Sequence, residues 1–336
     1  MKILIATPIY PPEAGGPAYY AKSLKAEFEK LGHTVVVRTF STEHSLPTGI
    51  RHLFYFFKTI PAYLRSDATI LFDTFSVGLP VALMKKLFGG SVVLRTGGDF
   101  LWEHYIERTG EKIVFSRFYD TPRRFNLKDK IVFACTRFVL RQVSEIVFST
   151  SYQRDVWMKP YGVDPSKVSI IENAYQKVSY VSEPTERKDF FCAVRGDMKW
   201  KNADSLERAF VKAKELVPGI ELDLRYDMPR HELLERLKTC YAVILVSLGD
   251  ISPNFILEAL SFGKPIILTN ENGLRDRIGD VVMYVDPLDE TAITNAIVAM
   301  CYEDAHRLYQ EKATAFSFEH SYADIAREIL HFLPQP

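Results

Sequence analysis

The stretch from Ser247 to Leu260, which contains Asp250 and Glu258, is the part of the sequence best suited to chemistry. Between them, Ser252 is a good N-cap and Pro253 fits a first helical position, which predicts a helix start. The free N–H groups of such a start favour an anion, with Asn254 beside it. Glu258 falls on an otherwise apolar helix, where an unpaired buried charge would be costly. We expect this helix to bind an anion at its start and hydroxyl groups at Glu258, although Asp250 alone could be a simple cap.

Two cations form a second candidate group, Arg195 and Lys201. Arg195 directly follows an apolar run that predicts a strand, and Lys201 precedes a predicted helix. A guanidinium and an ammonium in such a loop can neutralise a diphosphate. Lys199, between them, is expected to be solvated.

The predicted first domain offers two further candidates. Gly15 and Gly16 follow the first apolar run and open a helix, and paired glycines allow backbone to approach a phosphate; a plain tight turn is the alternative. Asp99 follows Thr96-Gly97-Gly98 at the end of another run. It could orient or deprotonate an acceptor hydroxyl, or only cap the next helix.

Short apolar runs alternate with helical patterns along the whole chain. This alternation predicts an α/β protein with parallel sheets covered on both faces. In such proteins, ligands bind beyond the carboxyl ends of the strands. The polar stretch 176–188 is the expected linker. The expected strands are residues 3–6, 33–39, 69–72, 91–94, 145–148, 168–171, 190–194, 221–225, 242–246, 265–268 and 281–285.

The composition restricts the function classes. The 42 basic residues balance the 42 acidic ones, which argues against nucleic-acid binding by bulk charge. The four cysteines lie far apart, as expected of reduced thiols in a cytoplasmic protein, and the histidines show no metal-ligand spacing. The sequence predicts neither a signal peptide nor a membrane-spanning run.

Two basic and aromatic stretches could contact a partner. One is residues 51–65, with the run Leu53-Phe54-Tyr55-Phe56-Phe57, and the other is residues 108–141. Either could lie peripherally on an anionic membrane or receive a charged acceptor. A buried helix face and a solvated loop are the plainer alternatives.

Taken together, these residues resemble retaining, nucleotide-sugar-dependent glycosyltransferases of the GT-B fold, in the large family 4 group. The likeness covers nearly the whole chain and rests on the following stretches: Tyr10-Pro11-Pro12-Glu13-Ala14-Gly15-Gly16-Pro17, residues 162–168 with Glu172-Asn173, and the block from Ser252 to Pro265. The family's two glutamates, separated by seven residues, read here as Asp250 and Glu258. The first acid is thus one methylene shorter, and the spacing from Arg195 to Lys201 is one residue longer than usual.

The resemblance implies two Rossmann-like domains facing a central cleft. The first domain, residues 1–177, would bind the acceptor, and the second, residues 178–318, would bind the nucleotide sugar. A helix in residues 319–336 is a candidate to cross back to the first domain. Glu258 would hold the ribose, Asp250 the donor sugar, Arg195 and Lys201 the diphosphate, and Tyr226 is a candidate to stack on the base. Gly15 and Gly16 look like the first-domain phosphate loop, and Asp99 falls near the acceptor-side catalytic region.

The implied reaction is hexosyl transfer, without a metal or a permanently bound cofactor, from a UDP- or GDP-sugar to a glycan, lipid-linked or small-molecule acceptor, as in cell-envelope polysaccharide synthesis. The alternatives are a GT-B relative with other chemistry, such as a sugar-nucleotide epimerase or a phosphorylase, and a catalytically silent binding subunit.

Overall fold

The structure is a computed structural model that describes residues 1–13, 15–40, 46–47, 49–177 and 187–334. The chain forms two compact units. Unit 1 consists of residues 1–101, 122–174 and 320–336, and unit 2 of residues 102–121 and 175–319. Most of the expected linker lies outside the described residues. Each unit is built on one parallel sheet, which confirms the predicted α/β class and the two Rossmann-like domains.

The sheet of unit 1 has six parallel strands in the order β2-β1-β3-β4-β5-β6. Strands β1 and β3 are almost wholly buried, as is usual for apolar strands of a parallel sheet covered on both faces. The chain runs from β1 to β2 on one side and returns to β3 on the other, so the strand order reverses between β1 and β3. The strands are β1 (Lys2–Thr7), β2 (Thr34–Thr39), β3 (Ala68–Leu71), β4 (Ser91–Thr96), β5 (Glu145–Phe148) and β6 (Val168–Ile170).

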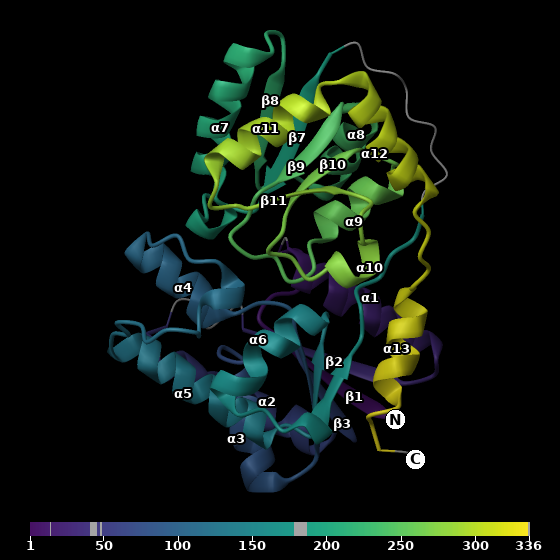
Figure 1. The fold of residues 1–336 in the computed structure, drawn as a ribbon. Helices are drawn as coiled ribbons and strands as arrows, with labels where there is room; N and C mark the ends of the chain where they lie inside the picture. The colour runs from purple at the N-terminus through teal and green to yellow at the C-terminus, as the bar shows by residue number, and fades with distance from the viewer. Residues whose placement is uncertain (14, 41–45, 48, 178–186, 335–336) are drawn as a thin grey trace. The chain divides into compact units, whose positions relative to one another are not determined.

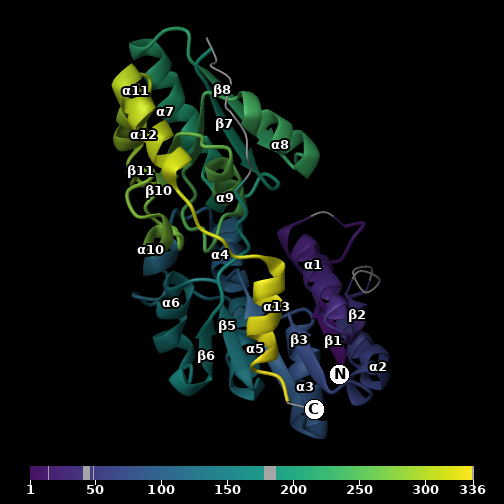
Figure 2. The same cartoon turned by 90° about the vertical axis from the view of Figure 1, so that its right-hand side faces the viewer.

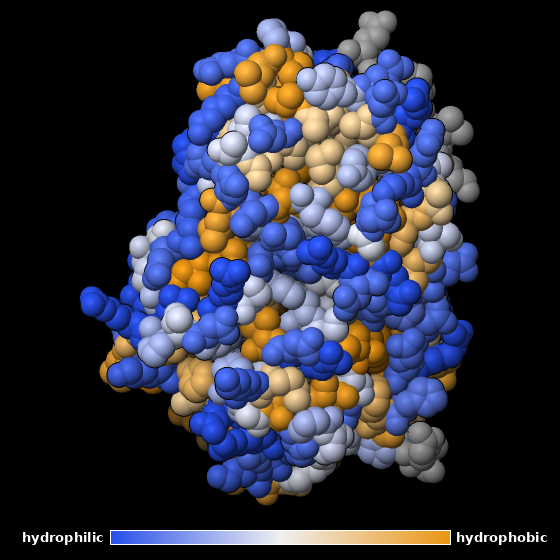
Figure 3. Space-filling view, in the orientation of Figure 1, coloured by the Kyte–Doolittle hydropathy of each residue, from blue (hydrophilic) through white to orange (hydrophobic). Residues whose placement is uncertain are grey.

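Helices cover this sheet, and three of them, α2, α3 and α5, form one layer in which α3 packs against both others. Figures 1 and 2 both draw these three side by side. At the lower edge of Figure 3, where Figure 1 draws α3, a few hydrophobic residues reach the surface among hydrophilic ones. The helices of unit 1 are α1 (Gly16–Lys30), α2 (Ile50–Leu64), α3 (Gly78–Phe88), α5 (Leu127–Gln142), α6 (Ser151–Tyr161) and α13 (Tyr322–Leu330).

The C-terminal helix α13 belongs to unit 1 and lies beside α1 (Figure 2). Its Ile325 and Ile329 are fully buried and share one core with Leu24 and Phe28 of α1. A capping box at Ser321 starts the helix, because the serine hydroxyl accepts from the N–H of Asp324 while the aspartate accepts from the N–H of Ser321.

The sheet of unit 2 has five parallel strands in the order β11-β10-β9-β7-β8. Here the chain moves from β7 to β8 on one side and then to β9 on the other, so the order reverses between β7 and β9. The strands are β7 (Asp189–Val194), β8 (Glu221–Tyr226), β9 (Ala242–Leu245), β10 (Ile266–Thr269) and β11 (Met283–Val285).

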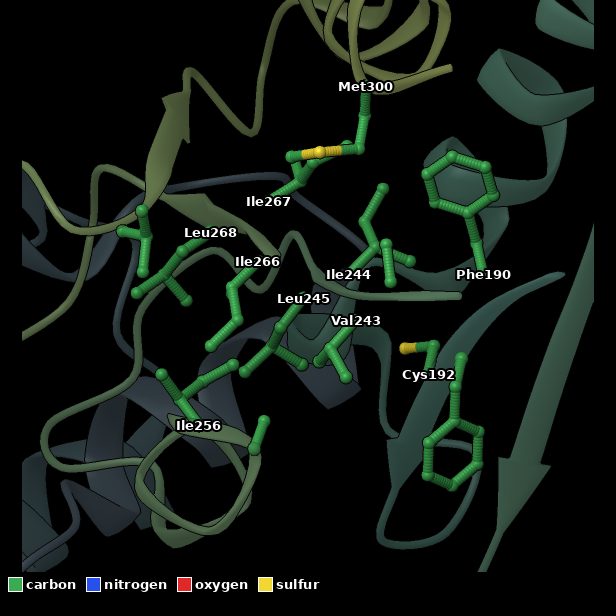
Figure 4. Packing of buried hydrophobic residues seen from close by; sticks show 14 of the residues in the cluster. Phe190, Cys192, Val243, Ile244, Leu245, Ile256, Ile266, Ile267, Leu268 and Met300 are labelled. Atoms are coloured by element: carbon green, nitrogen blue, oxygen red, sulfur yellow. The ribbon is translucent and has the colours of Figure 1, made fainter. Parts of the chain in front are cut away.

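The core of unit 2 lies between this sheet and its helices. Phe190, Ile244, Ile267 and Met300 are fully buried in one cluster, part of which Figure 4 shows. The helices are α4 (Phe100–Thr109, of which residues 102–109 belong to this unit), α7 (Ala203–Leu216), α8 (Arg230–Thr239), α9 (Asn254–Ser261), α10 (Arg275–Ile278), α11 (Glu290–Met300) and α12 (Glu303–Ala315).

One expected helix boundary is wrong. Helix α9 begins at Asn254, and its N-cap is Pro253 rather than Ser252. The ψ angle of Pro253 is 104°, which keeps this residue in extended backbone and moves the start one residue along.

The four cysteines carry free thiols: Cys192, Cys240 and Cys301 are buried, and Cys135 is partly exposed. Within the described ranges, every helix is too short or too polar to cross a membrane.

Candidate functional site

The strand-order reversal in unit 2 brings the loops after β7 and β9 together at the carboxyl edge of the sheet. Lys201 lies in the first loop and Asp250 in the second, and the distance from Lys201 Nζ to Asp250 Oδ2 is 2.8 Å. The two side chains are only 14% and 12% exposed, and Lys201 Nζ also lies 4.2 Å from the centre of the Trp200 ring. Lys201 was predicted to bind the diphosphate and Asp250 to contact the sugar. The structure brings these two side chains together as a mostly buried ion pair.

Asn202 fixes the backbone beside Lys201. It is fully buried and has a φ angle of 59°, a left-handed conformation that asparagine tolerates better than most residues. Its amide donates to the carbonyl oxygens of Val246 at 3.1 Å and Pro287 at 2.8 Å. The sequence prediction did not include Asn202, and an asparagine directly before a helix was the only signal for it.

The backbone of Asp250 is tied to the loop after β10. Its N–H donates to the Glu271 carbonyl at 2.9 Å, and its own carbonyl accepts from Gly273 N–H at 2.9 Å. Asp250 and Asn272 form a parallel β-bridge. These bonds hold the Asp250 carboxylate toward Lys201 without using the side chain.

Arg195 and Tyr226 lie at the ends of the neighbouring strands β7 and β8. Val194 pairs with Tyr226 in the sheet, so Arg195 follows directly at the edge. Arg195 is exposed; no hydrogen bond or ion pair of its side chain is found among the described residues. The Tyr226 ring is 44% exposed, and partial burial, followed by the charges of Glu207 and Asp197, raises the pKa of its phenol.

Helix α9 carries Glu258 on its polar side, while Ile256 and Leu260 are fully buried on the other. The Glu258 carboxylate accepts a hydrogen bond of 2.8 Å from Arg230 Nε, and this arginine at the start of α8 was not predicted. Glu258 therefore already has a cationic partner, which a ribose would have to share. At the start of α9, Asn254 is exposed, Ser252 is partly exposed and Pro253 is buried.

A segment from the first half of the chain completes the site in unit 2. Phe115 N–H donates to the Leu248 carbonyl at 2.9 Å, and Leu248 N–H donates to the Trp200 carbonyl at 2.8 Å. The Trp102 ring lies 5.5 Å from that of Trp200. We call residues 102–121 the inserted segment.

Gly249 is the point of closest approach to the inserted segment. A Cβ atom on Gly249 would lie 2.5 Å from Phe115 Cβ and 3.1 Å from the Trp102 ring, so only glycine fits without movement. This contact joins residues more than a hundred positions apart, which is why the sequence did not reveal it.

Lys112 of the inserted segment ties it to the start of α7. Its ammonium donates to Asn202 Oδ1 at 2.8 Å, Ser205 Oγ at 2.6 Å and Asp204 Oδ2 at 2.8 Å. Burial alone would raise the pKa of Asp204, but hydrogen bonds from Lys112 and Arg208 outweigh it and hold the pKa below the usual range.

The thiol of Cys192 lies beneath the site. Burial raises its pKa to about 12, while Lys201 and Asp250 act on it in opposite directions. The thiol therefore stays protonated near neutral pH and packs as an apolar group. No group of three or more His, Cys, Asp or Glu in the described ranges is arranged to hold a metal ion.

The remaining predicted residues lie in unit 1. Gly15 is the N-cap of α1, with a φ angle of 146°, and Gly16 is the first residue of that helix. The Asp99 side chain is buried and its carboxylate accepts a 2.8 Å hydrogen bond from Trp157 Nε1. Arg95, which was not predicted, is buried in β4 and donates to Asn173 Oδ1 at 2.7 Å.

No family model matches the sequence, and neither does any curated protein. Solved structures match nearly the whole chain. Sucrose-phosphate synthase from Thermosynechococcus elongatus has a TM-score of 0.73 at 14% identity, covering 98% of this chain and 97% of that one. WaaG, a glycosyltransferase involved in lipopolysaccharide biosynthesis, has a TM-score of 0.74 at 13% identity, covering 98% and 99%. HepE from Anabaena in complex with UDP-glucose has a TM-score of 0.70 at 14% identity, covering 98% of both chains.

The fold of these proteins is the GT-B fold that the sequence predicts, and the chain shares it.

Proposed function

We propose that the protein is a glycosyltransferase that moves a hexosyl group from a nucleoside diphosphate sugar to an acceptor hydroxyl. The observation that carries the proposal is the position of Arg195, Lys201 and Asp250 at the strand-order reversal of unit 2. In open parallel sheets this is where ligands bind. The similarity to HepE in complex with UDP-glucose supports a nucleotide-sugar donor.

In this proposal the two cations bind the diphosphate. Arg195 is exposed at the end of β7 and available to an incoming phosphate, and Lys201 would exchange part of its contact with Asp250 for phosphate oxygens. Charge develops on the departing diphosphate as the sugar leaves, so fixed cations stabilise the transition state more than the ground state. These side chains give the donor site a source of positive charge without a metal.

The other residues of unit 2 would bind the rest of the donor. The start of α9, with Ser252, Pro253 and Asn254, faces the phosphates with its free N–H groups. Glu258 would accept hydrogen bonds from the ribose beside Arg230, and the exposed Tyr226 ring would stack on the base. Asp250 would contact the sugar from its fixed position next to Lys201.

Unit 1 would take the acceptor, with Gly15 and Gly16 as its anion loop. Gly15 ends the loop that follows β1 and Gly16 begins α1, next to the strand-order reversal between β1 and β3. Ligands of open parallel sheets bind at such a reversal. The burial of Asp99 and its bond to Trp157 favour a role in positioning the loop after β4 over direct proton transfer. The acceptor class remains a glycan, a lipid-linked sugar or a small molecule.

We infer retention of the anomeric configuration. In that mechanism the acceptor attacks from the face that the diphosphate leaves, and a phosphate oxygen takes the acceptor proton. Such a reaction needs no second carboxylate across the sugar ring, and the group around Lys201 contains one carboxylate, Asp250, within hydrogen-bond distance of that ammonium.

The test is thermal unfolding of the purified protein with UDP-, GDP- and ADP-glucose. A ligand at about one hundred times its Kd stabilises the folded state by about 2.7 kcal/mol, so the matching nucleotide sugar should raise the Tm by several degrees. Lys201→Ala should remove this shift, whereas Lys214→Ala, an exposed lysine on α7, should retain it. If no nucleotide sugar stabilises the wild-type protein, the proposed donor site in unit 2 is wrong.

Transfer itself is tested by incubating the stabilising nucleotide sugar with a panel of acceptors. Release of the nucleoside diphosphate together with a glycosylated product supports the enzyme. Binding without release of the diphosphate on any acceptor would leave a silent binding subunit, and a changed donor sugar without transfer would indicate an epimerase.

A further inference from the structure

The outer face of the α2, α3 and α5 layer carries an unusual share of exposed hydrophobic side chains. These helices have 15, 11 and 16 residues, about an eighth of the chain, yet they hold ten of the twenty large hydrophobic residues found exposed in the described part of the protein. The ten are Ile50, Leu53, Phe54, Phe57, Leu64, Leu83, Leu87, Phe88, Leu127 and Ile131. Exposed apolar side chains gathered on three adjacent helices in this way indicate an interaction site.

A groove runs between the three helices and shows that their apolar side chains converge. It has a volume of about 370 Å³, within the range of pockets that hold a small ligand. Each helix contributes two of the lining residues that matter here: Leu53 and Phe56, Leu83 and Leu87, Ile131 and Cys135. The groove is open on the surface.

The same three helices are strongly basic, although the chain as a whole is neutral. Helices α2 and α3 each carry two Lys or Arg residues and no acid, and α5 carries four with one aspartate. That aspartate, Asp129, is buried in the capping box of α5 and offers little negative charge to the surface. The basic residues are Arg51, Lys58, Lys85, Lys86, Lys128, Lys130, Arg137 and Arg141.

We propose that this face docks on a lipid bilayer containing anionic lipids, with the groove taking one lipid hydrocarbon chain. An ordinary protein partner would account for exposed apolar residues but would not require an excess of positive charge. A bilayer surface matches both, because leucine and phenylalanine insert at the boundary of headgroups and chains while lysine and arginine pair with anionic headgroups. The inference does not depend on the proposed glycosyl transfer.

The test is flotation of the wild-type protein with two kinds of vesicle, pure phosphatidylcholine and phosphatidylcholine mixed with phosphatidylglycerol. We expect binding to the mixed vesicles only, weakening as salt is raised because the headgroup attraction is screened. A wild-type protein that stays free with mixed vesicles, or that binds both kinds equally, would overturn the proposal.

Two double variants separate the apolar and the electrostatic contributions. Leu53→Asp with Leu87→Asp places charge on the groove, and Lys86→Glu with Lys128→Glu reverses two exposed cations. Each pair should weaken binding by at least about tenfold. The matched control on α7 of unit 2 is Leu216→Asp with Lys214→Glu; Leu216 is 65% exposed, as Leu87 is at 64%. Equal loss in the control would contradict the assignment to this face, and circular dichroism shows that each variant is folded.

Cys135 provides a readout in the unaltered protein. It lines the groove and is partly exposed, whereas the other three cysteines are buried. Its alkylation, followed by mass spectrometry, should slow several-fold when mixed vesicles are present and not with phosphatidylcholine alone. An unchanged rate in vesicle-bound protein would show that another face binds the bilayer.

Discussion

The ammonium of Lys201 has two partners, the Asp250 carboxylate at 2.8 Å and the face of the Trp200 ring. Removing one partner of a mostly buried ion pair leaves the other charge without compensation, which is costly. The ion pair therefore limits the penalty of burying the Lys201 ammonium and, in the proposed function, holds it in place for the diphosphate. Under this proposal, a donor that takes the place of Asp250 beside Lys201 must supply negative charge of its own.

We expect Lys201→Met to lower kcat/KM for the donor by about 10²–10³-fold, because a fixed cation that stabilises the leaving group is lost. The measurement is steady-state kinetics with the nucleotide sugar identified by thermal unfolding. Lys214→Met serves as the control and should leave kcat/KM unchanged. Activity retained in Lys201→Met would remove this lysine from the site.

Glu258→Ala should weaken nucleotide binding by about 1.5–3 kcal/mol, the usual value of hydrogen bonds to a charged group. Titration calorimetry with the nucleoside diphosphate measures the loss. Arg230→Ala is the companion variant, because it removes the present partner of Glu258 without removing the carboxylate. If Arg230→Ala costs as much affinity as Glu258→Ala, the arginine and not the carboxylate binds the ligand.

Among the elements, the inserted segment has the clearest structural consequence for the site. It lies against the loop that carries Asp250 through the hydrogen bond between Phe115 and Leu248 and through the contact at Gly249. Ser116 Oγ also donates to Glu271 Oε1 at 3.0 Å, next to the backbone that holds Asp250. The position of Asp250 thus depends on a segment from the other half of the sequence.

Gly249→Ala should destabilise the protein by about 1–3 kcal/mol, as other substitutions that overfill a packed site do. The quantity to compare is the free energy of unfolding in urea. Gly97→Ala is a matched control, since its added Cβ would have no neighbour nearer than 4.0 Å. Equal stability of the two variants would mean that the inserted segment can move away from Gly249 at little cost.

The elements themselves were largely predictable, and their long-range contacts were not. Apolar runs such as β9 and the amphipathic helix α7 show their type locally, because a buried parallel strand and a half-buried helix each need a distinct pattern. The ends of the strands then placed Arg195, Lys201 and Asp250 correctly at one edge. Arg230, Asn202 and Phe115 were missed because their roles come from partners that the sequence does not bring near them.

For the whole molecule, partly buried histidines link stability to pH. The His306 ring stacks on Tyr241 with centroids 4.0 Å apart, and its Nε2 lies 3.1 Å from the Tyr241 carbonyl oxygen. Burial lowers the pKa of His306, and it also lowers the pKa values of His33 and His52. Folding therefore favours the neutral imidazoles.

The free energy of unfolding should accordingly fall on acidification. A folded-state pKa below the unfolded value of about 6.5 gives a stabilisation that is complete above that pH and is lost as the pH falls through the folded pKa. His306→Phe keeps an aromatic ring against Tyr241 and does not titrate, so its stability should decline less between about pH 7.5 and about pH 5. Urea unfolding across this range measures the difference, and parallel declines would show that His306 does not contribute.

The pairing of α13 with α1 also bears on how the chain is made. Helix α1 is synthesised early, yet the isoleucines that cover its Leu24 and Phe28 come from α13, after both sheets have been translated. Until then the apolar side of α1 lacks its native cover, so a stalled or truncated chain presents a hydrophobic surface to chaperones and proteases. The core of unit 1 thus becomes complete only after α13 has been synthesised, and nonsense mutations before or within α13 would leave the apolar side of α1 without its partner.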